Sequence, residues 1–135
     1  MLYVFDLEEI QGKKYKKLIQ YLCEVSDYVY FTTYEKFVIY DGIPELAGLG
    51  TRASVPKELT EWCQGDVIGY ETDIHVKQYF FMFDTLNQVL HDRLDEENVN
   101  LFFYQGEMQI ARIHNTFHKT LYIFTEDEQL MKEIK

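Results

Sequence analysis

Large aromatic side chains alternate with other residues along several short stretches of this chain. The alternating rings are Tyr28, Tyr30, Tyr40, Tyr79, Phe81, Phe102, Tyr104 and Tyr122. An alternating period places every second side chain on one face of a β-strand, and aromatic residues pack well on that pleated surface. The chain has 11 Tyr and 10 Phe, so rings carry most of its apolar area. These features predict an aromatic-rich β-sheet.

One stretch follows a helical period instead. Residues Tyr15, Leu18, Ile19, Leu22 and Cys23 recur at the spacing of one helix face, which predicts an amphipathic helix over residues 13–25. Shorter apolar stripes predict further helices after Pro56, Asp84 and Thr125. Strands are expected over residues 2–5, 28–33, 37–41, 74–83, 100–104, 108–114 and 119–124. The expected fold class is therefore α+β, with a mostly antiparallel sheet of about six strands and three to four helices packed on one face.

The chain has no Ser-, Gly- or Pro-rich stretch long enough to act as a linker, so residues 1–135 are expected to form a single domain. Its first residues lack the basic region of a signal peptide, and its longest apolar run is too short to span a membrane. Cys23 and Cys63 both fall on apolar helix positions and are expected to be buried, reduced thiols. A soluble, cytoplasmic protein is predicted.

A formal net charge of −10 narrows the classes of partner. Such a charge repels phosphate backbones and anionic lipids, and affinity for nucleic acid depends on neutralising phosphates with Lys and Arg. We therefore expect no nucleic-acid or membrane partner. A basic protein partner is favoured.

The glycine-containing loop over residues 48–54 is one candidate site. It precedes a predicted helix start, so Arg52, Ser54 and exposed backbone amides could hold an anionic group, with Tyr40 and Trp62 stacking on the ligand. The loop lacks the Gly-Lys-Ser/Thr ending of a P-loop. The alternative interpretation is a connector in which Ser54 assists a helix cap.

His114 and His118 have the i, i+4 spacing of metal ligands on a helix, and His75 or Glu107 could supply a third ligand. The pair instead brackets a predicted strand end and turn, where this spacing does not direct both rings to one point. We therefore expect no metal and no cofactor. Cys63 falls at the C-terminal end of a helix, where the dipole disfavours a thiolate, so a packed cysteine is favoured over a nucleophile.

Together these features favour a noncatalytic, acidic interaction module or inhibitor-type protein over an enzyme. Its expected contact residues are Tyr28 and Tyr30 on a sheet face and the acidic residues Asp92, Glu96 and Glu97. The alternative is a small-ligand binding domain, or an enzyme without a recognisable motif, that uses the 48–54 loop and the helix end at Trp62. A homodimer in which two sheet faces cover each other is the third hypothesis.

Overall fold

A computed structural model describes residues 1–32, 46, 48–62, 67–91, 100–114 and 119–135. Six strands form one antiparallel sheet in the order β1-β6-β5-β4-β2-β3. The strands are β1 (Leu2–Asp6), β2 (Tyr28–Thr32), β3 (Val67–Glu71), β4 (Asn100–Gln105), β5 (Met108–His114) and β6 (Thr120–Phe124). The predicted α+β fold class is confirmed.

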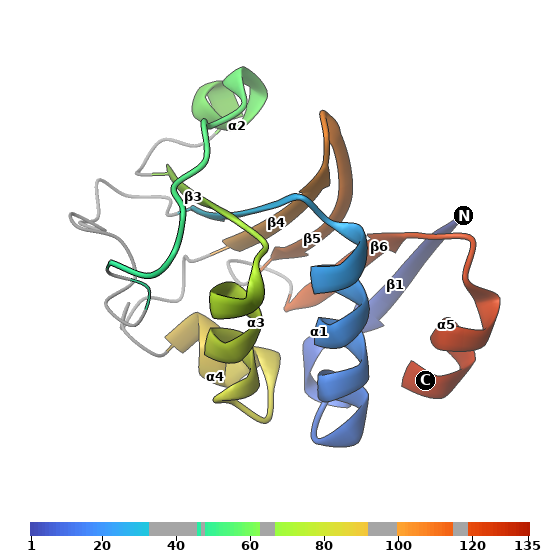
Figure 1. The fold of residues 1–135 in the computed structure, drawn as a ribbon. Coiled ribbons are helices and arrows are strands. Elements are labelled where there is room, and N and C mark those ends of the chain that lie inside the picture. The colour runs from blue at the N-terminus through green and yellow to red at the C-terminus, as the bar shows by residue number, and fades with distance from the viewer. Residues whose placement is uncertain (33–45, 47, 63–66, 92–99, 115–118) are drawn as a thin grey trace.

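The helices lie on both sides of this sheet, but unequally. They are a short 3-10 helix η1 (Leu7–Glu9), α1 (Lys13–Val25), α2 (Lys57–Trp62), α3 (Ile74–Phe81), α4 (Leu86–His91) and α5 (Glu128–Ile134). Figure 1 shows α1, α3, α4 and α5 on one side of the sheet and α2 alone on the other. Among the described residues, no helix is both long enough and apolar enough to cross a membrane.

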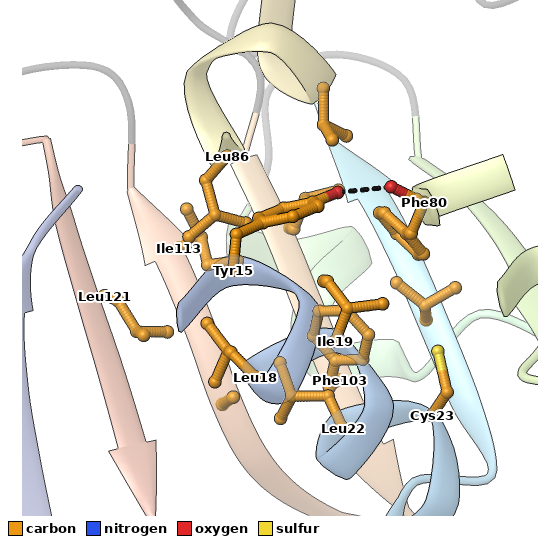
Figure 2. Close-up of a cluster of buried hydrophobic side chains, with 14 of the residues drawn as sticks. Tyr15, Leu18, Ile19, Leu22, Cys23, Phe80, Leu86, Phe103, Ile113 and Leu121 are labelled. Atoms are coloured by element: carbon orange, nitrogen blue, oxygen red, sulfur yellow. Dashed lines mark hydrogen bonds between the residues drawn. The ribbon is translucent and has the colours of Figure 1, made fainter. Parts of the chain in front are cut away.

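The main core lies between the sheet and the four helices. The predicted stripe of α1 is buried along its whole length and lies against Phe103 of β4, Ile113 of β5 and Leu121 of β6 (Figure 2). The hydroxyl of Tyr15 donates a hydrogen bond of 2.6 Å to the carbonyl of Phe80, and burial raises the pKa of Tyr15. Burial also raises the pKa of the Cys23 thiol to about 12, which confirms the predicted packed cysteine. Cys63 lies outside the described residues.

The strand predicted over residues 74–83 is wrong, because this segment begins with helix α3. Asp73 caps the helix, and its Oδ1 accepts hydrogen bonds from the amides of His75 and Val76 at 3.0 and 3.2 Å. Val76, Tyr79 and Phe80 are buried at a helical spacing. The aromatic and β-branched composition suggested a strand. A helix forms instead, because its 3.6-residue period buries these side chains together in the core.

The sequence also misplaced the neighbours of β2. Residues 67–71 are not among the expected strands, but they form β3, which pairs with β2 along all five of its residues. The other edge of β2 pairs with β4 in the same way. Both edges of β2 are therefore occupied. The strand expected over residues 37–41 lies outside the described residues.

Lys16 of α1 forms hydrogen bonds at the C-terminal end of α3. Its Nζ donates hydrogen bonds of 2.6 Å to the carbonyl oxygens of Phe81 and Phe83, and it lies 5.3 Å from the centre of the Phe81 ring. An ammonium group at this position satisfies carbonyls left unpaired at a helix C-terminus and complements the helix dipole.

Lys16→Met is expected to lower the free energy of unfolding by about 1–2 kcal/mol, because it leaves both carbonyls without their charged donor. Urea denaturation followed by circular dichroism measures the change. Lys13→Met, at an exposed position of the same helix, should change it by less than about 0.5 kcal/mol. Equal effects of the two substitutions would show that the Lys16 contacts contribute nothing.

Candidate functional site

A second, smaller cluster of buried side chains lies on the sheet face opposite the main core. It consists of Tyr30, Leu59, Phe102 and Tyr104, and α2 contributes Leu59. The ring of Tyr30 meets that of Tyr104 edge to face, with 5.3 Å between centroids. Part of this face is therefore covered by α2.

The ring of Tyr30 lies directly over Gly69, its cross-strand neighbour on β3. A Cβ atom at Gly69 would stand 2.4 Å from Cε1 and 2.6 Å from Cδ1 of Tyr30, far inside van der Waals contact. Only glycine lets the ring lie flat against β3 at this point.

The chain over residues 51–54 is held along the edge of β3. The amide of Ala53 donates a hydrogen bond of 2.9 Å to the carbonyl of Gly69, and the amide of Glu71 donates one of 2.9 Å to the carbonyl of Thr51. The hydroxyl of Tyr30 donates to the carbonyl of Ser54 at 2.9 Å. These bonds fix one wall of a groove.

The groove has a volume of about 690 Å³. It lies between the 52–58 segment, the ends of β2 and β3 and the β4–β5 turn, and is lined by Tyr28, Tyr30, Arg52, Ala53, Ser54, Val55, Pro56, Lys57, Glu58, Glu71, Gly106 and Glu107. Tyr28 is half-buried, and the sheet register places Glu71 directly opposite it on β3. Side chains directly opposite on one face of an antiparallel pair are close neighbours, so Glu71 flanks the Tyr28 ring.

Carboxylates dominate the charge of this groove. Glu58, Glu71 and Glu107 are exposed along it. Two cationic side chains also line it: Lys57 Nζ lies 3.7 Å from Glu61, and the Arg52 guanidinium lies over the Tyr70 ring at 5.6 Å. The three carboxylates outnumber them. The groove therefore presents a negative field beside an aromatic ring.

Glu58 is oriented by the buried cluster beneath it. The hydroxyl of Tyr104 donates a hydrogen bond to Glu58 Oε1 and accepts one of 3.1 Å from the side-chain amide of Gln109. Burial, and then the hydrogen bond to Glu58, raises the pKa of Tyr104, so the hydroxyl keeps its proton and continues to donate.

A neighbouring cavity extends the acidic surface. It has a volume of about 290 Å³, and Asp27, Glu71 and Asp73 line it together with Tyr28. The Asp27 carboxylate accepts a hydrogen bond of 2.7 Å from the amide of Gly106, which ties the β4–β5 turn to the end of β2. Tyr28 and Glu71 thus line both the groove and this cavity.

The structure brings four of the predicted site residues to the groove: Arg52, Ser54, Tyr28 and Tyr30. Tyr30 is only 2% exposed, so it supports the groove from beneath, whereas Tyr28 opens onto it. Tyr40, Asp92, Glu96, Glu97 and His118 lie outside the described residues. Trp62 ends α2, and its side chain is not described.

The other metal-ligand candidate, His114, lies among aromatic rings. Its imidazole meets Phe102 and Tyr122 edge to face, at 6.1 and 5.8 Å between centroids. Within the described ranges, no three His, Cys, Asp or Glu side chains are grouped as a metal site.

Comparison with known proteins adds no relative. No protein-family model matches the chain, and no curated protein or solved structure matches it significantly. The functional argument therefore depends on the geometry of the groove.

Sequence reasoning missed the groove carboxylates Glu58, Glu71 and Glu107. Glu71 falls in a segment where no strand was expected, and Glu107 was considered only as a third metal ligand. The available signal was a carboxylate next to a turn at each of two strand ends, but it becomes a site only once β2 is known to lie between β3 and β4.

Proposed function

We propose that this protein is a noncatalytic binding module that takes a basic segment of another protein into the groove beside Tyr28. The observation that carries this proposal is the half-buried Tyr28 ring, with Glu71 opposite it and Glu58 and Glu107 along the same groove. A Lys or Arg side chain over a tyrosine ring gains a cation–π interaction, and neighbouring carboxylates supply its counter-charges.

The charge of the whole protein supports the same partner class. At a net charge of −10, the chain attracts basic proteins over a distance and increases their rate of encounter. The same negative charge disfavours nucleic acid, because the groove carboxylates would repel its phosphates.

The groove gives less support to an enzyme. Acid–base catalysis by carboxylates depends on a pair in contrasting environments, one of them apolar, whereas Glu58, Glu71 and Glu107 are all exposed side chains. The alternative of an anionic ligand at Arg52 and Ser54 is opposed by these carboxylates and by the position of the Arg52 guanidinium over Tyr70. A cytoplasmic location accords with the packed, unpaired thiol of Cys23.

The double variant Glu71→Lys with Glu107→Lys is expected to weaken binding of a hexa-arginine peptide by about tenfold or more, since two counter-charges become repulsive. Titration followed by amide chemical shifts measures the affinity. It also locates the peptide, which should perturb Tyr28, Glu71 and Gly106 in the unaltered protein. A hexa-glutamate peptide should cause no such perturbation.

The matched control is Glu8→Lys with Glu9→Lys, which changes the net charge equally at two exposed residues of η1. It should weaken peptide binding by less than about threefold, an effect of the general field alone. If both double variants weaken binding equally, only net charge attracts the peptide and the groove is not the binding site.

A further inference from the structure

Another cavity, of about 170 Å³, shares the lining residue Glu58 with the acidic groove. Its lining residues are Glu58, Leu59, Phe102, Gln109, Arg112 and His114, contributed by α2, β4 and β5. The ring of Phe102 and the side chain of Leu59 form its apolar part, and both are buried in the smaller cluster. A space of this size accommodates about one small ring or branched aliphatic group.

Arg112 supplies the positive side of this cavity. Its guanidinium stacks on the Tyr122 ring, 4.7 Å from the centroid, which holds the planar group in place. Its Nε is buried without a hydrogen-bond partner, and among the described residues no carboxylate lies within ion-pair distance of the guanidinium. In a chain with 23 acidic and 13 basic residues, a partly buried arginine without an ion pair is a candidate to bind an anionic group.

His114 does not add a second positive charge to this cavity. Burial, and then the neighbouring Arg112, lowers the pKa of His114, so its imidazole is neutral at neutral pH. Arg112 is therefore the one positive charge among the residues that line this cavity.

Glu58 supplies the negative side. Its Oε1 is held by the Tyr104 hydroxyl, and that hydroxyl also accepts from Gln109, so the carboxylate is oriented by neutral groups. Glu58 and Arg112 line the same small cavity without forming an ion pair with each other. A ligand that carries both charges can bridge them.

We propose that this cavity binds a free α-amino acid with a small apolar side chain. The ligand carboxylate pairs with the Arg112 guanidinium, whose planar donors match it, and the ligand ammonium pairs with Glu58. The side chain packs on Phe102 and Leu59. This site is independent of the proposed protein-binding groove, except that Glu58 lines both.

Titration of the whole protein with L-leucine, followed by the amide and side-chain resonances of Phe102, Arg112 and His114, tests the proposal. Saturable shifts at these residues are expected. 4-Methylpentanoate, which lacks the ammonium, and isopentylamine, which lacks the carboxylate, should each bind at least about tenfold more weakly, the usual effect of removing one charged contact. Equal binding of either analogue would overturn the zwitterion assignment.

Arg112→Gln and Glu58→Gln should each weaken leucine binding by at least about tenfold, and Arg112→Lys should recover part of the loss because it restores the charge without the planar fork. Lys119→Gln and Glu61→Gln, at exposed positions outside the cavity, should leave it unchanged. Thermal unfolding of each variant shows whether the fold is intact. Absence of saturable shifts in the folded, unaltered protein would refute the proposal.

The test of leucine binding at this cavity can be distinguished from the test of peptide binding at the groove. Glu71→Lys with Glu107→Lys should abolish most peptide binding but leave leucine binding intact, because neither residue lines this cavity. Loss of leucine binding in that double variant would show that the two sites are one.

Discussion

Phe80→Ala is expected to lower the free energy of unfolding by about 3–5 kcal/mol, the usual cost of removing a fully buried phenylalanine ring. Phe80 has no exposed surface, and its ring stacks on Phe31 and contacts Phe103, with centroids 6.1 and 5.8 Å apart. The substitution removes the ring that joins α3 to the sheet and leaves a cavity in the main core (Figure 2). Urea or thermal denaturation measures the loss.

Met82→Ala is the informative control. Met82 is 63% exposed, so its truncation should cost less than about 0.5 kcal/mol. In a β-strand, residues 80 and 82 would point to the same face and the two substitutions would have comparable effects. Comparable losses of stability would therefore contradict the helical assignment of α3.

Gly69→Ala is expected to destabilise the protein by about 1–3 kcal/mol, the cost of inserting an atom into a packed site. The new Cβ would overlap the Tyr30 ring, which cannot move freely because its hydroxyl is bonded to Ser54 and its edge packs on Tyr104. Within a strand, alanine is otherwise more stabilising than glycine. We therefore expect the overlap with the Tyr30 ring to make Gly69→Ala destabilising. Denaturant unfolding measures the change.

The double-mutant cycle with Tyr30→Ala supplies the control for that explanation. Once the ring is absent, Gly69→Ala should be neutral or stabilise the protein by up to about 1 kcal/mol. A loss of more than about 1 kcal/mol in that background would mean that β3 itself, and not the contact with Tyr30, excludes a side chain at this position.

Local patterns in the sequence were sufficient for much of the fold. The five apolar residues of α1 predicted both its limits and its buried face, and the strands around Gly106 were recognisable from their alternating rings and short turn. The segment after Asp73 failed because its composition favours a strand, while the capping carboxylate and the Val76, Tyr79 and Phe80 spacing favour a helix. Local preference was overruled there by packing on Phe31 and Phe103.

The candidate site was less predictable, since it depends on strand order. Arg52 and Ser54 could be nominated from the loop that contains them, and Tyr28 from its alternation with Tyr30. Nothing local to Glu71 or Glu107 shows that both reach Tyr28, because they follow different strands and meet only where β3 and β4 flank β2. The unpaired Arg112 is likewise recognisable only from its surroundings.

The pairing of β1 with β6 has a consequence for biosynthesis. Every residue of β1 lies opposite a residue of β6, a strand that follows it far along the chain, so β1 is synthesised well before its partner. At a translation rate of 5–20 residues per second, the interval between synthesis of β1 and synthesis of β6 is on the order of ten seconds. During that interval it is an extended segment with unpaired amides and carbonyls, and such segments are the usual starting points of aggregation. Slower translation should therefore lengthen the time for which β1 is exposed without its partner strand.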